Sequence, residues 1–428
     1  MEYKYFNIKN QYLLDTGFLF YGILCISKLE LENIKVNIHM GGNVLNRKIS
    51  LIIVFVLLFQ FVAIAYAEDS LEINAKSAIL IDYYTGEILY EQDSNNKLPP
   101  ASISKIMTLL LGMEALESGK IQLDDKVRIS NHAAGMGGSQ LWLEEGEVQT
   151  VEDLFRAIVL RSANDASVAL AEHIAGSEEV FVKMMNERAK ELNMSHSNFA
   201  NATGIPNEDH YVSAGDVAKM SRELLNHKKI HDWLTIYMDE MTVGKKKDKT
   251  AGLVNTNRLV KEYEGTTGIK TGSTQEAGFC LSASAKRGNL HLIAVVMGAE
   301  TSKIRFDESM RLLDYGFANY DSVSIGRQGD VLAKVPVHKG SSEFIEAVLE
   351  RDSYILVSKG GSTNLNKEII LPEFIESPIN EGDKIGELKI KIDGREIDNI
   401  KLISKQSIGK AKFKEMFKKV VKSLLINK

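Results

Sequence analysis

The sequence has few of the residues that build disulfide frameworks and metal sites. Only two cysteines occur among 428 residues, and Cys25 lies in a segment that we expect to be removed, so Cys280 has no partner for an internal disulfide. Nine histidines are present, but the pair His227 and His231 encloses Lys228-Lys229-Ile230 in place of the Glu-x-x of a zinc helix. We therefore expect no metal and no cofactor.

The chain also lacks an excess of either charge. It has 52 Lys and Arg against 57 Asp and Glu, a net charge of −5, and no basic patch outside the C-terminal tail suggests nucleic acid as a partner. No internal repeat or low-complexity tract is present. The hydrophobic content of 44% is sufficient for real cores, and the length allows two or three domains.

Three short motifs stand in order along this chain: Ser102-Ile103-Ser104-Lys105, Ser162-Ala163-Asn164 and Lys270-Thr271-Gly272. Together they supply a hydroxyl nucleophile, a base, a second hydroxyl with an amide, and a cationic site for an anion. Each motif alone is weak, because Ser94-Asn95-Asn96-Lys97 and Ser407-Ile408-Gly409-Lys410 fit the first pattern with no sign of chemistry. The order and the surroundings of the motifs therefore carry the inference.

The first motif opens an apolar run at residues 106–116 that predicts a buried helix. Residues three apart on a helix share a face, so Lys105 can reach the Ser102 hydroxyl. A lysine that accepts a proton near pH 7 needs its pKa lowered by about 3 units, which burial and a second cation, Lys270, can supply. The alternative is that Ser102 is an ordinary helix cap and Lys105 a surface lysine.

The second motif is a short polar break between two predicted apolar helices, at residues 151–159 and 166–174. Ser162 could relay a proton between Lys105 and the leaving amine, and Asn164 could hold an amide of the substrate. A plain helix cap is the alternative, since Ser, Asn and Asp are all good capping residues.

The third motif belongs to a predicted antiparallel meander of strands at residues 267–272, 279–286 and 290–298. A glycine in an edge strand lets the backbone of a substrate approach closely.

Lys270 and the Thr271 hydroxyl would then bind a carboxylate beside Gly272, and the backbone N–H groups of Ser102 and Ser273 could form an oxyanion hole. A structural lysine at the end of a strand is the alternative.

The set S-x-x-K, S-x-N and K-T-G resembles that of the penicillin-recognising serine enzymes. Longer stretches narrow the resemblance to the low-molecular-mass penicillin-binding proteins that are D-alanyl-D-alanine carboxypeptidases; these stretches are residues 100–108, 162–166, 199–204, 268–272 and 277–278. The resemblance runs from about Ala75 to Ala318. It implies an α+β fold, with a β-lactamase/transpeptidase-like domain in which helices flank an antiparallel sheet.

The resemblance also implies a function and a set of roles. The substrate would be the D-Ala-D-Ala end of peptidoglycan stem peptides, and β-lactams would acylate the same serine. The implied roles are nucleophile for Ser102, proton acceptor for Lys105, proton relay for Ser162, and substrate binding for Lys270 and Arg305. The segment 137–141 resembles a loop at the rim of the family's cleft, although its glycines could equally serve a turn.

Two other functions stay open, a serine β-lactamase and a penicillin or peptidoglycan sensor that acylates without turnover. Class A β-lactamases commonly carry Glu-x-x-x-Asn after S-x-N, and no Glu between Asn164 and Asn226 has Asn four residues on. The complete set of catalytic residues disfavours a pure sensor.

Residues 1–67 form a predicted leader. Asn46-Arg47-Lys48, the apolar stretch 49–64 and Ala65-Tyr66-Ala67 read as a secretory signal cut after Ala67. The alternative is an uncleaved membrane anchor, since 49–67 is about long enough to span a bilayer. Because an export signal normally begins its chain, we also hypothesise that the chain starts at Met40.

After a catalytic domain at 68–321, short alternating apolar runs predict a β-rich domain at 322–405. Residues 406–428 predict a basic amphipathic helix that lies in a membrane interface. The alternative is a terminal helix docked on the protein's body. We therefore expect an exported enzyme at the outer face of the cytoplasmic membrane or in the cell-wall space.

Overall fold

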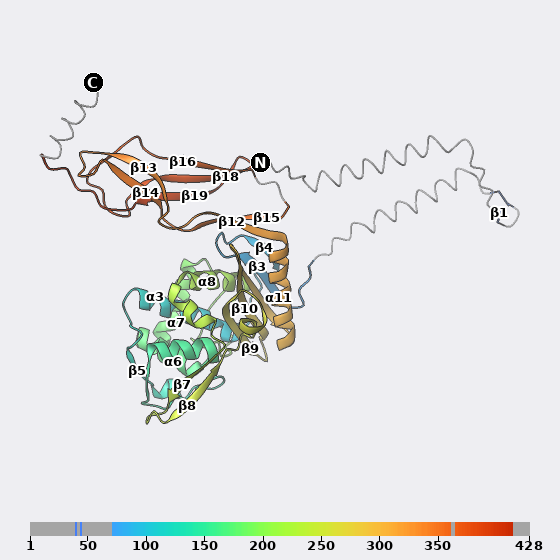
Figure 1. Ribbon diagram of the computed structural model, residues 1–428. Coiled ribbons are helices and arrows are strands. Elements are labelled where there is room, and N and C mark those ends of the chain that lie inside the picture. Colours follow the sequence, from blue (N-terminus) through green and yellow to red (C-terminus); the bar gives the residue numbers. More distant parts are fainter. Residues whose placement is uncertain (1–38, 41–42, 45–70, 361–363, 414–428) are drawn as a thin grey trace, which may run out of the picture. The chain divides into compact units, whose positions relative to one another are not determined.

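The computed structural model describes residues 39–40, 43–44, 71–360 and 364–413 (Figure 1). Strands β1 (His39–Met40) and β2 (Asn43–Val44) pair with each other. The predicted signal segment and all of the predicted terminal helix beyond residue 413 lie outside the described residues. Within the described part of the chain, no helix has the length and apolar character needed to cross a membrane.

A five-stranded antiparallel sheet forms the centre of the first large part of the chain. Its strands in spatial order are β4 (Ile88–Gln92), β3 (Ser77–Asp82), β11 (Leu290–Ala299), β10 (Gly278–Arg287) and β9 (Thr266–Thr274). The predicted meander is confirmed, because β9 pairs with β10 and β10 with β11, both antiparallel. The third motif therefore lies on an edge strand of the sheet.

Helices cover the sheet and explain why its central strand is apolar along its whole length. All ten residues of β11 are buried. Helix α11 (Ser302–Asn319) packs against β10 and β11, and helix α8 (Ala214–Asn226) packs against β3 and β11. A strand that is covered on both faces has no polar side, so its sequence does not alternate.

The remaining elements of this part are helical with short strand pairs. They are η1 (Ala101–Ser104), α3 (Lys105–Glu117), β5 (Lys126–Arg128), α4 (Asn131–Ala134), β6 (Val148–Thr150), α5 (Val151–Arg156), η2 (Ala157–Arg161), α6 (Asn164–Ala175), α7 (Glu178–Glu191), η3 (Lys228–Ile230), α9 (His231–Leu234), β7 (Met238–Val243), β8 (Lys249–Val254) and α10 (Leu259–Glu262). Together with the sheet they give the predicted α+β fold, which is confirmed.

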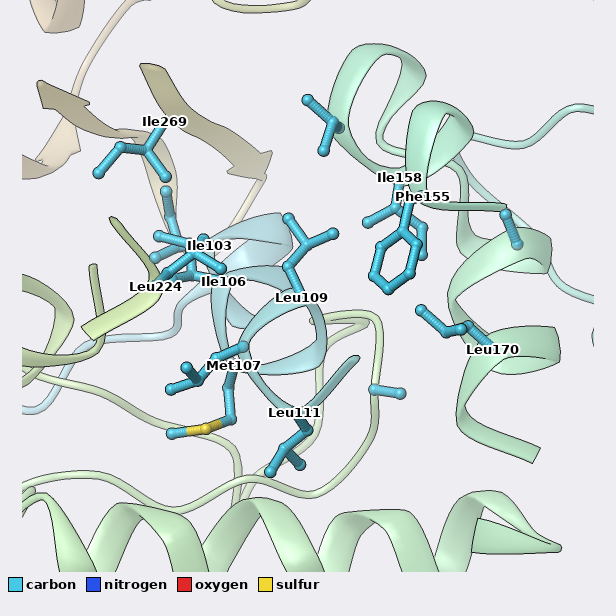
Figure 2. Packing of buried hydrophobic residues seen from close by; sticks show 14 of the residues in the cluster. Ile103, Ile106, Met107, Leu109, Leu111, Phe155, Ile158, Leu170, Leu224 and Ile269 are labelled. Carbon is cyan, nitrogen blue, oxygen red and sulfur yellow. The ribbon is translucent and has the colours of Figure 1, made fainter. Parts of the chain in front are cut away.

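Helix α3 is the centre of the helical core (Figure 2). Ile106, Met107 and Leu109 are fully buried, and Figure 2 shows Phe155 and Leu170 on neighbouring helices facing them. A helix that is apolar on all sides is typical of one buried on all sides. The motif that opens α3 is therefore anchored in rigid, close-packed surroundings.

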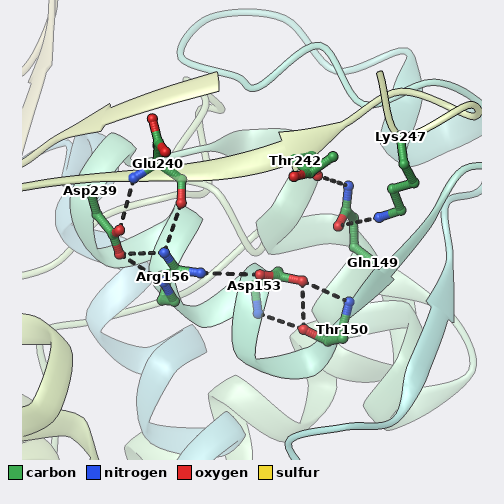
Figure 3. Close-up of polar contacts among 8 residues, drawn as sticks. All are labelled: Gln149, Thr150, Asp153, Arg156, Asp239, Glu240, Thr242 and Lys247. Atoms are coloured by element: carbon green, nitrogen blue, oxygen red, sulfur yellow. Dashed lines mark hydrogen bonds and ion pairs between the residues drawn. The ribbon is translucent and has the colours of Figure 1, made fainter. Parts of the chain in front are cut away.

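Hairpin β7–β8 is tied to the helical part by polar contacts (Figure 3). Arg156 on α5 forms an ion pair with Asp239 and donates a hydrogen bond to the carbonyl of Glu240. Gln149 donates to the carbonyl of Thr242 and accepts from Lys247. These contacts fix the hairpin, which is followed in the chain by α10 and then by β9, the strand of the third motif.

The second large part is built of strands. They are β12 (Tyr320–Gly326), β13 (Val331–His338), β14 (Phe344–Leu349), β15 (Ser353–Ser358), β16 (Leu365–Ile370), β17 (Ile375–Glu376), β18 (Lys384–Ile392) and β19 (Arg395–Ser404). Six form a sheet in the order β16-β18-β19-β14-β13-β17, and β12 pairs with β15. Ile408 lies in the core of this part and Lys410 forms a bridge with Gly340, so strand-type pairing continues to residue 410.

Candidate active site

Ser102 lies in η1, a single 3-10 turn that runs directly into α3. The sequence predicted the first turn of an α-helix; the tighter turn still places Lys105 beside Ser102, because residues i and i+3 eclipse in a 3-10 helix. The turn packs closely on Gly204, where a Cβ would lie 1.7 Å from the carbonyl oxygen of Ala101. Any larger residue at 204 would displace the turn that carries Ser102.

Lys105 is fully buried and its Nζ atom faces three oxygens. Nζ lies 3.0 Å from Ser102 Oγ, 2.6 Å from Asn164 Oδ1 and 2.6 Å from the carbonyl oxygen of Thr203. The amide and carbonyl oxygens can only accept hydrogen bonds. A neutral amine satisfies both with its two N–H bonds and keeps its lone pair for the hydroxyl of Ser102, which makes Ser102 the donor.

The electrostatics of the site favour that neutral form. Burial holds the pKa of Lys105 well below its usual range, and the positive charge of Lys270 lowers that pKa further. The carboxylate of Asp165 acts in the opposite direction and is the weakest of the three influences. The predicted causes, burial and Lys270, are thus the two that lower the pKa.

The backbone that leads from α5 to the second motif has an unusual conformation. Helix α5 continues into a π-helical turn, η2, and Ser162 follows it in the left-handed region at φ 59°. Its hydroxyl is buried and has no hydrogen-bond partner among the described residues. Because an unpaired buried hydroxyl is costly, this atom is open to a hydrogen-bond partner that the described residues do not supply. The role of Ser162 as a proton relay stays a prediction.

Asn164 connects Lys105 to the predicted rim segment. Its Oδ1 accepts from Lys105, while its Nδ2 donates to the carbonyl of Gly137 at 2.6 Å. Its backbone N–H donates to the carbonyl of Ser139 at 2.7 Å. The segment 137–141 therefore lies against the second motif. One N–H of the Asn164 side chain is used within the protein, and the binding of a substrate amide by Asn164 stays a prediction.

The same rim segment is held by a buried acid. The carboxylate of Asp165 is fully buried and accepts the backbone N–H groups of Leu141 and Leu143 at 2.9 Å and 3.1 Å. Between them Trp142 adopts a positive φ of 62° and its side chain is 74% exposed. Asp165 thus keeps this loop in a conformation that its own sequence does not favour.

The third motif presents a buried lysine and a hydroxyl at the edge of the sheet. Lys270 is 1% exposed and its Nζ donates to the carbonyl of Thr271 at 3.0 Å. Burial, followed by the charge of Arg305, lowers the pKa of Lys270 to about 7. The Thr271 hydroxyl donates to the Thr256 hydroxyl at 2.7 Å, and Ser273, next after Gly272, is exposed.

Arg305 is buried and forms a hydrogen bond to the backbone of this strand. It lies in the first turn of α11, is 8% exposed, and donates to the carbonyls of Gly272 at 3.0 Å and Cys280 at 3.3 Å. Direct binding of a substrate carboxylate by Arg305 stays a prediction. Across the described residues, no group of three or more His, Cys, Asp or Glu side chains is placed to hold a metal ion.

Three members of the site were not found by sequence reasoning: Thr203, Thr256 and His210. Thr203 contributes its backbone carbonyl, and since every residue has one, the sequence does not indicate which carbonyl contacts Lys105. His210 is 3% exposed with Nε2 2.9 Å from Ser104 Oγ, and burial, followed by the charge of Lys105, lowers the pKa of His210 to about 4. His210 and Ser104 are 106 residues apart in the sequence, so no local pattern indicated that they are in contact.

Two families match this chain in adjacent segments. The family described as D-alanyl-D-alanine carboxypeptidase matches residues 64–301, and the family described as penicillin-binding protein 5, C-terminal domain, matches residues 320–410. The first match contains all three motifs, and the second covers the strand-built part.

Individual relatives agree with the two matches. The D-alanyl-D-alanine carboxypeptidase DacF of Bacillus subtilis is 44% identical over 384 residues, covering 88% of this chain and 98% of that protein. DacC of Escherichia coli, described by the same activity, is 32% identical and covers 83% of this chain and 90% of its own length. The crystal structure of penicillin-binding protein 5 from Haemophilus influenzae has a TM-score of 0.63 at 30% identity, covering 79% of this chain and 99% of that one.

Proposed function

The chain belongs to the D-alanyl-D-alanine carboxypeptidase family, and from that premise we propose how its own residues carry out the reaction. It is a serine-type carboxypeptidase of the penicillin-binding class. The β-lactamase and the sensor are not favoured, because the matched family and the relatives are described as carboxypeptidases. We propose the D-Ala-D-Ala end of a peptidoglycan stem peptide as substrate.

The first step forms an ester on Ser102. Neutral Lys105 takes the proton of the Ser102 hydroxyl as Oγ attacks the carbonyl between the two D-alanines. The negative charge on the carbonyl oxygen is held by the backbone N–H groups of Ser102 and Ser273, and the terminal carboxylate binds at Lys270 and Thr271.

The bond to the last D-alanine then breaks. The proton on Lys105 passes through the Ser162 hydroxyl to the departing amine, which leaves as free D-alanine. A water molecule gives its proton to Lys105 and attacks the ester carbonyl, and the proton returns to Ser102 Oγ as the shortened peptide is released. A β-lactam acylates Ser102 in the same first step, but its ring nitrogen stays attached to the acyl group.

One observation carries this proposal: the buried Nζ of Lys105 meets two oxygens that can only accept and one hydroxyl. An ammonium group in this position would have to be buried without a counter-ion in contact, which is costly. The arrangement therefore favours a free base aimed at the nucleophile.

The test has two measurements on the purified full chain. Mass spectrometry after mixing with a β-lactam should locate one covalent adduct on Ser102, and a peptide ending in D-Ala-D-Ala should release D-alanine. Ser102→Ala should abolish both, whereas Ser118→Ala, at the end of α3, serves as the matched control and should keep both. An adduct on another residue, or release of D-alanine by a folded Ser102→Ala protein, would refute the assigned roles.

We propose further that the enzyme is exported by the segment 49–67 and held at the outer face of the cytoplasmic membrane by the C-terminal helix. This helix was predicted from residue 406, but Ile408 and Lys410 form strand-type bridges, so it can begin only after residue 410. The family's action on the cell wall supports a place outside the cytoplasm. The alternating lysines and apolar residues of 410–425 support the interfacial helix. After cell lysis at low salt, the full chain should be found with the membranes, and a chain that ends at residue 410 should be soluble. A full chain that is wholly soluble would contradict the anchor.

A further inference from the structure

The carbonyl that accepts a hydrogen bond from Lys105, that of Thr203, lies in irregular backbone. Residues 199–207, the Thr203 segment, form no helix and no strand. A carbonyl in such a segment has no ladder of backbone hydrogen bonds to fix its direction, so side chains have to fix it. The direction matters, because the carbonyl oxygen lies 2.6 Å from Nζ of Lys105.

The Thr203 segment is folded onto one of its own side chains. Oδ1 of Asn201 accepts the N–H groups of Thr203 and Gly204 at 3.1 Å and 2.7 Å. The second N–H belongs to the same planar peptide group as the Thr203 carbonyl, so Asn201 sets the local plane of that carbonyl. Bonds within the segment do not set its distance from Lys105, which depends on contacts with other elements.

Two helices hold the segment from outside, and both do so at Ala202. Its carbonyl accepts from the Thr108 hydroxyl at 2.7 Å, and its N–H donates to Glu178 Oε1 at 2.9 Å. Thr108 lies on α3, one turn after Lys105, and Glu178 is the first residue of α7. The two backbone groups of Ala202 are thus fixed from two sides.

The second oxygen of Glu178 extends this link towards the rim segment. Oε2 lies 2.7 Å from Nε2 of His132, in the short helix α4 that precedes residues 137–141. The rim segment in turn accepts from the side chain of Asn164, whose Oδ1 is the other oxygen that meets Lys105. The Glu178 side chain is 13% exposed. One largely buried carboxylate therefore connects the parts of the chain that hold both acceptors.

We propose that Glu178 is a positioning residue for the acylation of Ser102. By holding the N–H of Ala202, Glu178 keeps the Thr203 carbonyl in contact with Lys105. When both N–H bonds of the neutral amine are fixed, its lone pair is directed at the hydroxyl of Ser102. The inference rests on the proposed function, since it takes Lys105 as the base.

Glu178 also has a structural role, which the choice of variants separates from the positioning role. It lies in the first turn of α7 together with Glu179, where acids stabilise a helix through its dipole. That stabilisation requires the charge, whereas the bond from Ala202 requires an acceptor oxygen. Glu178→Gln removes the charge and keeps an acceptor, and Glu178→Ala removes both.

The experiment measures acylation of the full chain by a chromogenic β-lactam at increasing concentrations. These data separate the limiting rate of acylation from the dissociation constant of the initial complex. Glu178→Ala should lower the limiting rate about tenfold, since a misplacement of about 1 Å costs about 100-fold and other contacts still hold the segment. The dissociation constant should change less than about twofold, because the interaction acts on the reaction and not on binding.

Glu178→Gln should retain most of the wild-type limiting rate. Glu179→Ala is the matched control, because it removes an exposed acid from the same turn of α7, and it should acylate at the wild-type rate. Thr108→Val removes the other anchor of Ala202 and should lower the limiting rate as Glu178→Ala does. Thermal unfolding verifies that the variants are folded.

The outcomes separate the two hypotheses. If the wild-type chain forms no acyl-enzyme, the proposed function is wrong and the positioning role falls with it. If the wild-type chain is acylated and folded Glu178→Ala keeps its limiting rate, the positioning role is overturned while the carboxypeptidase stands. The same holds if Glu178→Gln or Glu179→Ala is as slow as Glu178→Ala, because the loss would then follow the charge of the helix and not the acceptor.

Discussion

Replacing Gly272 by alanine tests whether the third motif has to contact the turn that carries Ser102, the proposed nucleophile. A Cβ at this position would lie 2.9 Å from the backbone nitrogens of both Ser102 and Ile103, and 3.1 Å from the carbonyl oxygen of Pro100. All three atoms are backbone, so no side chain can rotate away. The contact falls about 0.5 Å short of the 3.4 Å at which ordinary van der Waals contact begins.

Strand β9 and the turn η1 must therefore separate by about half an ångström, which moves the N–H of Ser102 relative to that of Ser273. A misplacement of about 1 Å can cost about 100-fold in rate, so we expect acylation by a β-lactam to slow about tenfold. Overpacking of this kind also costs about 1–3 kcal/mol of stability.

The assay is the second-order rate constant of acylation by a chromogenic β-lactam, with urea unfolding measured on the same samples. Gly252→Ala is the matched control, because Gly252 also lies in a strand, β8, and its Cβ would meet nothing within 4 Å. A Gly272→Ala protein that acylates at the wild-type rate, with wild-type stability, would refute the close contact between β9 and the nucleophile.

Three further substitutions probe the electrostatics and support of the site. Lys270→Gln removes a positive charge that lowers the pKa of Lys105, so the acid limb of the pH profile for β-lactam acylation should move to higher pH. Lys270→Arg keeps the charge and should leave the limb in place. An unshifted profile in Lys270→Gln would contradict the effect of Lys270 on the pKa of Lys105. Asp165→Asn removes the charge that raises the same pKa, so the limb should move to lower pH, and loss of the charged acceptor should cost about 1–3 kcal/mol in urea unfolding. A shift in the same direction as Lys270→Gln would exclude this explanation. Thr256→Val deletes the partner of the Thr271 hydroxyl and should raise KM for the peptide about two- to tenfold with little change in kcat; a fall in kcat alone would argue against a positioning role.

Much of the fold could be predicted because its signals are local. The apolar run after Lys105 predicted a buried helix, and α3 is that helix. The runs around the third motif predicted an antiparallel meander, and β9, β10 and β11 form it. The prediction was less accurate after Val151. One helix was expected at residues 151–159, but the α-helix α5 ends at Arg156 and a π-helical turn, η2, follows it. Periodicity does not distinguish these helix types over so few residues.

The sequence by itself determined the chemical inventory of the site: a serine three residues before a lysine, a serine two residues before an asparagine, and a lysine beside a threonine on a strand. It also determined that Lys105 would need burial and a neighbouring cation to act as a base, since the reference pKa of lysine does not depend on the fold.

Only the tertiary structure decided what surrounds Lys105. Its two other partners are an amide 59 residues away and a backbone carbonyl 98 residues away. A backbone carbonyl is present in every residue, so its use leaves no trace in the sequence, and the direction of a side-chain amide depends on packing. The proposed nucleophile and base are thus indicated by short-range spacing, whereas the burial and the nearby charge that lower the pKa of Lys105 arise from contacts between distant segments.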